Sequence, residues 1–207
     1  MSVNQQDRFD SVAPHYDRIF ERLERRIMRP WRSRVWAEVA GCNVLEVGVG
    51  TGFNAPYYSP ARRVTAVDVS MGMLRRTRAK LAARGEAIPA LAQMDVQHLG
   101  FADGVFDCAV ATLVFCGVPD PVQGLRELAR VVRAGGRIVL LEHMRARARC
   151  IARAMDALNP LAWAIIGEDI NRDTVANVRA AGLRVLRDEP LWAWGIVRLI
   201  VAERVGE

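Results

Sequence analysis

The sequence predicts an α/β fold in which a mostly parallel sheet carries helices on both faces. Short apolar runs rich in β-branched residues alternate with helical patterns along most of the chain, and the final two runs lack an intervening helix. Strands and helices in alternation produce right-handed crossovers between parallel neighbours. With 207 residues, of which 51% are hydrophobic, and no segment typical of a linker, residues 1–207 are expected to form one domain.

Seven short apolar runs are predicted to be buried strands, because continuous apolar stretches of this length are typical of strands covered on both faces. They are residues 43–48, 63–68, 88–94, 106–113, 137–143, 183–188 and 196–203. The sixth and seventh follow each other directly, and two strands joined by a loop are most simply antiparallel. The sheet is therefore expected to end on a reversed strand.

Three helices are predicted between these strands from their start and stop signals. Residues 70–84 begin with Ser70 as N-cap and stop at Gly85. Residues 121–134 begin with a proline at the first helical position and are closed by two glycines at 135–136. Residues 171–181 form the third.

Three glycines at alternate positions follow the first predicted strand, in the stretch VLEVGVGTG at residues 44–52. Because glycine has no side chain, Gly48, Gly50 and Gly52 let the main chain approach a ligand closely. The dinucleotide pattern G-x-G-x-x-G requires a third glycine where Phe53 stands. This mismatch argues against an NAD-dependent oxidoreductase, which stays a remote alternative.

Two acidic residues end the neighbouring strands. Asp68 lies 20 residues beyond Gly48 at the end of the second strand, where a carboxylate accepts hydrogen bonds from both hydroxyls of a ribose. Asp95 closes the next strand, within reach of an adenine amino group. A glycine loop followed by these two acids describes an adenosine pocket without a phosphate clamp.

Several motifs resemble those of the class I S-adenosylmethionine-dependent methyltransferases. They are E-V-G-V-G-T-G (46–52), A-V-D-V-S (66–70), Q-M-D-V (93–96), F-D-C-A-V-A-T-L (106–113) and R-A-G-G-R-I-V-L-L-E-H (133–143). The resemblance implies a Rossmann-like fold with seven strands in the order 3-2-1-4-5-7-6, strand 7 being antiparallel. It also implies S-adenosylmethionine as cofactor and S-adenosylhomocysteine as its product.

The resemblance further implies which residues bind the cofactor. The glycine loop would line its methionine part, Asp68 would bind the ribose, Asp95 would hold the edge of the adenine, and Glu46 would orient the loop. The full set is Tyr16, Glu46, Gly48, Val49, Gly50, Gly52, Asp68, Val69, Met73, Asp95, Val96 and Thr112.

The stretch FDSVAPHYD (9–17) is similar to the A-x-x-Y-D segment of the quinone and phospholipid methyltransferase branch, in which Tyr16 would close over the cofactor. This branch includes phospholipid N-methyltransferases, quinone C-methyltransferases and alkyl-thiol methyltransferases. The resemblance therefore implies an amphipathic small molecule as acceptor, with the amine headgroup of phosphatidylethanolamine as the first expectation. A quinone-precursor C- or O-methyltransferase and an alkyl-thiol S-methyltransferase are the alternatives.

Two residues are candidates for a catalytic role on the acceptor side. S-adenosylmethionine carries its own activation, so the protein mainly aligns the acceptor and needs little acid–base machinery. His143, at the tip of the fifth strand, is placed to take a proton or steer a headgroup. Tyr16 is the second candidate. The alternative for His143 is a strand-end histidine bonded to a loop.

Two flanking segments indicate the nature of the acceptor. Residues 1–40 are expected to form an N-terminal helical cap, in which 17–36 place apolar side chains on one side and arginines on the other. Such a cationic amphipathic helix is typical of one lying on an anionic membrane, although a helix packed on the sheet with a solvated arginine face has the same pattern. Residues 144–170, basic and then apolar, are expected to form a helical insertion over the acceptor site.

Composition narrows the partners and the location. The four cysteines show neither metal-ligand spacing nor a disulfide framework, so no metal site is expected. The net charge of +6 comes almost wholly from arginine, so no nucleic-acid partner is inferred, although a nonenzymatic membrane- or nucleic-acid-binding module stays open. No signal sequence or membrane span is visible. A cytoplasmic protein is expected, with peripheral contact at the inner membrane surface left open.

Overall fold

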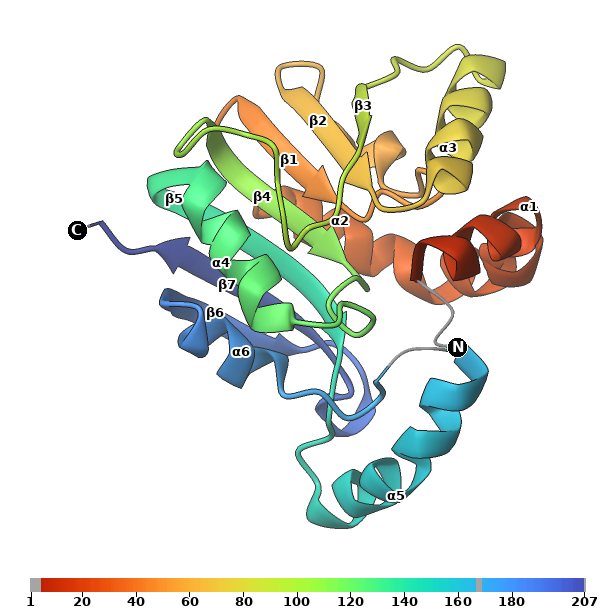
Figure 1. Cartoon of the computed structure of the whole chain (residues 1–207), viewed down its shortest axis with the longest axis vertical. Helices are drawn as coiled ribbons and strands as arrows, with labels where there is room; N and C mark the ends of the chain where they lie inside the picture. The colour runs from red at the N-terminus through yellow and green to blue at the C-terminus, as the bar shows by residue number, and fades with distance from the viewer. Residues whose placement is uncertain (1–4, 167–168, 207) are drawn as a thin grey trace.

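A computed structural model describes residues 5–166 and 169–206 and contains a seven-stranded sheet (Figure 1). The strands are β1 (Asn43–Val47), β2 (Arg63–Asp68), β3 (Ala90–Gln93), β4 (Phe106–Thr112), β5 (Val132–His143), β6 (Leu183–Pro190) and β7 (Val197–Arg204). Their spatial order is β3-β2-β1-β4-β5-β7-β6. Strands β1 to β5 pair in parallel, and β7 is antiparallel to both β5 and β6. The expected fold class and strand order are confirmed.

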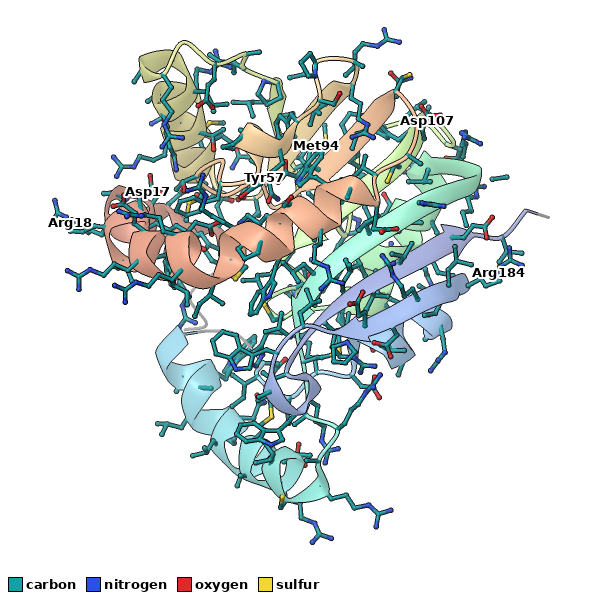
Figure 2. All side chains as sticks on the ribbon, turned by 180° about the vertical axis from the view of Figure 1, so that it is seen from behind. Asp17, Arg18, Tyr57, Met94, Asp107 and Arg184 are labelled. Carbon is teal, nitrogen blue, oxygen red and sulfur yellow. The ribbon has the colours of Figure 1, made fainter. Side chains whose placement is uncertain are left out.

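Helices cover both faces of this sheet. The helices of the described residues are α1 (Gln5–Leu23), η1 (Glu24–Met28, a π-helix), α2 (Arg29–Ala37), α3 (Met71–Ala83), α4 (Pro121–Val131), α5 (Arg149–Ile166) and α6 (Thr174–Ala180), with short 3-10 turns η2 (Ala55–Tyr57) and η3 (Ala193–Gly195). Helices α4 and α6 lie on the face seen in Figure 1, and α2 crosses the opposite face, seen in Figure 2. The carboxyl ends of the parallel strands β1, β2 and β4 lie side by side at one edge of the sheet.

Strand β1 contributes to the apolar cores on both faces of the sheet, because successive side chains point to opposite faces. Leu45 of β1 packs with Leu125 and Leu128 of α4, whereas Val44 packs with Val35 of α2. All five of these side chains are fully buried. The apolar runs therefore predict strands correctly because both faces of the sheet are covered.

Strand β5 begins earlier than the sequence predicts. A helix was expected to continue to residue 134, but α4 ends at Val131 and β5 starts at Val132. The register between β4 and β5 shifts after Phe106, so residues 133–136 bulge out of the ladder. A Cβ on Gly136 would lie 2.7 Å from the Asp107 carbonyl oxygen, so the glycines here permit a tight bulge instead of ending a helix.

The N-terminal helices run from Gln5 to Ala37, with the π-helix η1 between α1 and α2. The predicted apolar stripe divides at this point. Met28 and Val35 are buried against the sheet, whereas Ile19 and Leu23 stay 60% and 41% exposed. The part of the stripe from Met28 onward therefore serves packing, and the part that precedes the π-helix faces solvent.

The segment after β5 contains α5, which projects from one end of the sheet (Figure 1). Residues 167–168 of the expected insertion 144–170, and residues 1–4 of the expected cap, lie outside the described residues. The backbone N–H of Asp169 donates to the carbonyl oxygen of Cys116 at 2.9 Å, which attaches the insertion to the loop after β4. Within residues 5–166 and 169–206, no helix is long and apolar enough to span a membrane.

Candidate active site

A cavity opens at the carboxyl ends of β1, β2 and β4, with about 760 Å³ of empty space when the solvent at its mouth is included. In parallel sheets this edge is where ligands bind, at the point where neighbouring connections run to opposite faces. The cavity is lined by Phe9, Tyr16, Val47, Gly48, Gly50, Val67, Asp68, Val69, Met73, Met94, Asp95, Val96, Thr112, Leu113, Val114 and Val118. Most of this lining is apolar, and its carboxylates belong to Asp68 and Asp95.

The glycine loop forms the floor of the cavity and depends on the absence of side chains. Gly48 and Gly50 have φ of +64° and +56°, a region that other residues rarely adopt. A Cβ on Gly48 would lie 2.4 Å from Cγ2 of Val114, so the loop after β4 requires glycine there. At Gly50 no heavy atom lies within 4 Å of the Cβ position, which leaves open space beside the main chain. This combination is a cradle that a ligand can enter.

Asp68 ties two loops together at the tip of β2. Its Oδ2 accepts from the Gly50 N–H at 2.8 Å, and its Oδ1 accepts from the Ser70 N–H at 2.9 Å. The residue is 7% exposed, and this burial raises the pKa of its carboxyl above the usual value, although both backbone hydrogen bonds oppose the shift. Because each carboxylate oxygen has a further lone pair, the group is able to accept two hydroxyls of one sugar.

An apolar slot lies beside Asp68. Val69 and Met73 line it from the start of α3, and Val96 lines it from the loop after β3. Asp95 stands at its edge, where its carboxylate accepts from the backbone N–H of Gln97 at 2.9 Å and from the Gln97 side-chain amide. A flat aromatic base with an amino group at its edge fits this set of side chains.

Helix α1 covers the cavity. Tyr16 lines it and packs with Phe20 and Phe53, with ring centroids 4.6 and 6.3 Å apart. Polar contacts hold the helix in place, since Asp10 accepts from the Ser70 hydroxyl at 2.5 Å and from the Gly72 N–H at 2.7 Å. The cavity is therefore covered by an aromatic side chain on a helix that hydrogen bonds fasten to α3.

A second attachment of α1 lies beside the glycine loop. Asp17 pairs with Lys80 of α3 at 2.9 Å and accepts from the Thr51 hydroxyl at 2.5 Å. Figure 2 shows Asp17 on the side of the helix that faces α3, and Arg18 on the outer edge. The A-x-x-Y-D segment thus places its tyrosine at the cavity and its aspartate on the loop.

Four of the expected site residues do not line the cavity: Glu46, Val49, Gly52 and His143. Val49 packs with Ala66 and Leu74 beneath the loop. His143 follows Leu141 at strand spacing and is therefore on the α2 face, where burial lowers its pKa. The structure does not bring His143 to the same cavity as Tyr16.

Glu46 also points to the α2 face, with 1% of its surface exposed. It accepts from the Asn54 side-chain amide at 2.7 Å and from the Tyr58 hydroxyl. Burial raises the pKa of its carboxyl from 4.5 to about 7, against the opposing effect of these hydrogen bonds and of Arg32. Glu46 thus supports the loop from beneath.

Seven lining residues were not predicted from the sequence: Phe9, Val47, Val67, Met94, Leu113, Val114 and Val118. Leu113 has φ of +56°, an unusual value that marks a strained turn after β4. Glu142 holds this turn, because its Oε1 accepts from the backbone N–H groups of Val114 and Phe115 at 3.0 and 3.1 Å. An acid inside the apolar run LLEH, Glu142, was the sequence feature that could have predicted the position of this loop.

Within the part of the chain that the structure describes, no three His, Cys, Asp or Glu residues gather closely enough to hold a metal ion. The cavity offers instead a bare main chain, a carboxylate with free lone pairs and an apolar slot.

Comparison with known proteins identifies relatives of this chain. Residues 45–140 match the family described as "Methyltransferase domain". The phosphatidylethanolamine N-methyltransferase of Cereibacter sphaeroides is 38% identical over 163 residues, covering 74% of this chain and 80% of that protein. The demethylmenaquinone methyltransferase of Clavibacter sepedonicus is 32% identical over 215 residues, covering 92% and 86%.

A solved structure shows the same fold. The structure of a geranyl diphosphate methyltransferase in complex with S-adenosylmethionine superposes with a TM-score of 0.69 at 13% identity, covering 85% of each chain. At this identity the likeness concerns the fold alone.

The raised pKa of Glu46 predicts a pH-dependent stability. The folded state holds the proton up to about pH 7 and the unfolded chain only to about 4.5, so the free energy of unfolding falls as the pH rises between these values. Relative to Glu46→Gln, the unmodified protein should lose about 2 to 3 kcal/mol between pH 5 and pH 8. Urea unfolding at both pH values measures this difference.

The exposed carboxylate of Glu21 provides the control, since Glu21→Gln should follow the unmodified protein at both pH values. Parallel pH dependence of the Glu46→Gln variant and the unmodified protein would contradict the assignment.

Proposed function

The chain belongs to the class I S-adenosylmethionine-dependent methyltransferases of the phospholipid and quinone branch, and on that basis we propose that it methylates the amine headgroup of a phospholipid, phosphatidylethanolamine in the first place. The observation that carries this proposal is the 38% identity to a phosphatidylethanolamine N-methyltransferase over 74% of the chain. The surface around the cavity supports it independently.

The cavity has the groups that the cofactor requires. Asp68 would hold the ribose, Val69 and Met73 would flank the adenine with Asp95 and Val96 at its edge, and the space beside Gly50 would admit the methionine part. When bound, S-adenosylmethionine supplies a methyl group made electrophilic by a cationic sulfur.

The protein's own contribution is alignment and exclusion of water. Leu113, Val114 and Val118 make the β4 side of the cavity apolar, and Tyr16 covers it from α1. With His143 outside this lining, we assign acceptor positioning to Tyr16. A neutral amine brings its own lone pair, so alignment with the methyl group is the main requirement.

Exposed apolar side chains on α1 adjoin the cavity. Phe20 contacts Tyr16, and together with Ile19 and Leu23 it is 36% to 60% exposed. Five exposed arginines share this helical region and make no ion pair or hydrogen bond through their guanidinium groups with another described residue: Arg18, Arg22, Arg25, Arg26 and Arg29. An apolar patch beside unpaired cations suits an anionic lipid surface. We propose peripheral contact with such a membrane through this region.

The helical insertion 144–170 is proposed to border the acceptor. It is attached to the loop after β4 by the Asp169–Cys116 hydrogen bond. Its helix α5 exposes Leu158, Leu161 and Trp163, which suits an acceptor with a long apolar part.

A quinone precursor is the second candidate acceptor. The similarity to the demethylmenaquinone methyltransferase extends over 92% of this chain, more than the share matched by the phospholipid enzyme. An apolar β4 side of the cavity also suits an aromatic ring with a prenyl tail.

Replacing Asp68 tests the cofactor assignment. Asp68→Ala removes the acceptor of two hydroxyl hydrogen bonds, so the dissociation constant of S-adenosylhomocysteine should rise about 100-fold. Isothermal titration calorimetry measures it. Asp103→Ala, which removes an exposed carboxylate paired with Arg130, should leave the affinity unchanged. Near-normal affinity of Asp68→Ala would remove the ribose assignment.

A tritiated-methyl assay tests the acceptor. The panel contains phosphatidylethanolamine vesicles, a demethylated quinol and a long-chain alkyl thiol, each extracted into an organic phase. Label on the phospholipid is expected, and chromatography of the product should show a methylated amine. Label on the quinol alone would replace the first candidate by the second, and label on the thiol alone would exclude both.

Vesicle sedimentation tests the membrane contact. Changing Arg22, Arg25, Arg26 and Arg29 to Gln should reduce binding to anionic vesicles at least about tenfold, because each arginine near the surface contributes about 1 kcal/mol. The matched control changes Arg133, Arg137, Arg184 and Arg187 to Gln, which removes the same charge from side chains paired with acids. Equal losses in both variants would mean that net charge alone drives binding.

A further inference from the structure

A buried chain of five polar side chains connects the N-terminal helices to the cavity. Its members are Glu24, Arg32, Asn54, Glu46 and Thr112, and each is between 1% and 8% exposed. Buried polar groups are costly unless every partner is in place, so such a network holds its members in one arrangement. Only Thr112 among these five lines the cavity.

The first link depends on the π-helix η1. A π-turn inserts one residue into a helix, and such turns occur frequently at functional sites. Here Glu24 and Met28 of η1 are buried, whereas Arg25 and Arg26 between them are exposed. The Nε of Arg32 donates to Oε1 of Glu24 at 2.8 Å. The helix therefore brings a charge pair inside the protein.

The second link fixes the orientation of the Asn54 amide. Nη1 of Arg32 donates to Oδ1 of Asn54 at 2.8 Å, and a guanidinium group has no acceptor to offer. The amide nitrogen must therefore face the other way, where it donates to Glu46 at 2.7 Å and to Oγ1 of Thr112 at 3.1 Å. If the amide were flipped, the Asn54 NH2 group would face the N–H of Arg32, and two donors would meet with no acceptor between them.

The third link leaves one hydrogen of Thr112 available. Because its oxygen accepts from Asn54, the hydroxyl hydrogen points elsewhere, and within the described residues the side chain makes no second hydrogen bond. Thr112 ends β4 and Asp68 ends β2, with β1 between them. If the ribose of the cofactor lies at Asp68 and its adenine at Asp95, its methionine end extends toward Thr112.

We propose that Asn54 is a positioning residue that presents the Thr112 hydroxyl as a hydrogen-bond donor to the methionine carboxylate of the bound cofactor, and that the Glu24–Arg32 pair fixes Asn54 in this role. The carboxylate is the group at that end of the cofactor that accepts hydrogen bonds strongly. This inference rests on S-adenosylmethionine as the occupant of the cavity and is independent of the acceptor.

The charge pair can be removed without removing its packing. Glu24→Met with Arg32→Met replaces a buried ion pair by apolar side chains of similar length, which is often neutral for stability. The thermal midpoint should stay within a few degrees of the unmodified protein, while the dissociation constant of S-adenosylhomocysteine rises about tenfold, the loss expected for one hydrogen bond. A merely structural pair would leave this affinity unchanged, and that result would overturn the proposal.

Thr112 variants test the same link without touching the pair. Thr112→Val keeps the shape and loses the donor, so it should weaken S-adenosylhomocysteine about tenfold, whereas Thr112→Ser should bind within about twofold of the unmodified protein. Adding the pair replacement to Thr112→Val should weaken binding no further, because both changes remove one hydrogen bond. Additive losses, or unchanged affinity in Thr112→Val, would contradict the proposal even if the pair variant fails to fold.

The matched control lies on the same helix. Arg34 of α2 pairs with Glu189 of β6, away from the cavity, and Arg34→Met with Glu189→Met should leave cofactor affinity unchanged. Binding of S-adenosylhomocysteine to the unmodified protein tests the cofactor assignment separately. No binding there would exclude the cofactor, whereas normal binding in the variants would exclude only the positioning role of Asn54.

Discussion

The carboxylate of Asp68 is the contact on which the site depends. It joins the glycine loop after β1 to the N-terminus of α3 by accepting from the Gly50 and Ser70 N–H groups. These loops come from neighbouring strand tips, so one buried acid sets the width of the cavity between them. In the proposed complex the remaining lone pairs of the same group would accept the ribose hydroxyls, so the residue that shapes the cavity would also recognise the sugar.

Around this contact, acidic and basic side chains lie in different parts of the protein. Acids lie at the cavity and beneath it, with Asp68 and Asp95 in the lining and Glu46 buried under the loop. Exposed arginines that pair with no acid among the described residues lie on α1, η1 and α2. The cationic cofactor would thus lie on the cavity side of the N-terminal helical region, and an anionic membrane would contact its arginine side. The proposed membrane contact requires this separation.

Local signals in the sequence predict much of this arrangement. The Ser70 cap, the glycine spacing and the acids at the strand ends each act within a few residues, so they locate α3, the loop and Asp68 correctly. Alternation along a strand also indicates that two of the expected residues do not line the cavity. Glu46 shares the face of Val44 and His143 shares the face of Leu141, and both faces pack toward α2.

Other features depend on contacts between distant segments and leave no local pattern. The apolar spacing of residues 17–36 fits an uninterrupted helix, so the π-helix at Glu24–Met28 was not predicted. It is favoured by the buried pairing of Glu24 with Arg32, which also donates to Asn54. The early start of β5 likewise depends on pairing of Val132 with Phe106. The cavity residues from the strained turn at Leu113 belong to the same category.

A crystal structure of the complex with S-adenosylhomocysteine would show whether Asp68 binds the sugar. Both ribose hydroxyls should lie within hydrogen-bond distance of the Asp68 carboxylate, and the thioether chain should pass beside Gly50 toward Thr112. A nucleoside bound elsewhere, or an Asp68 side chain turned away from the sugar, would contradict it.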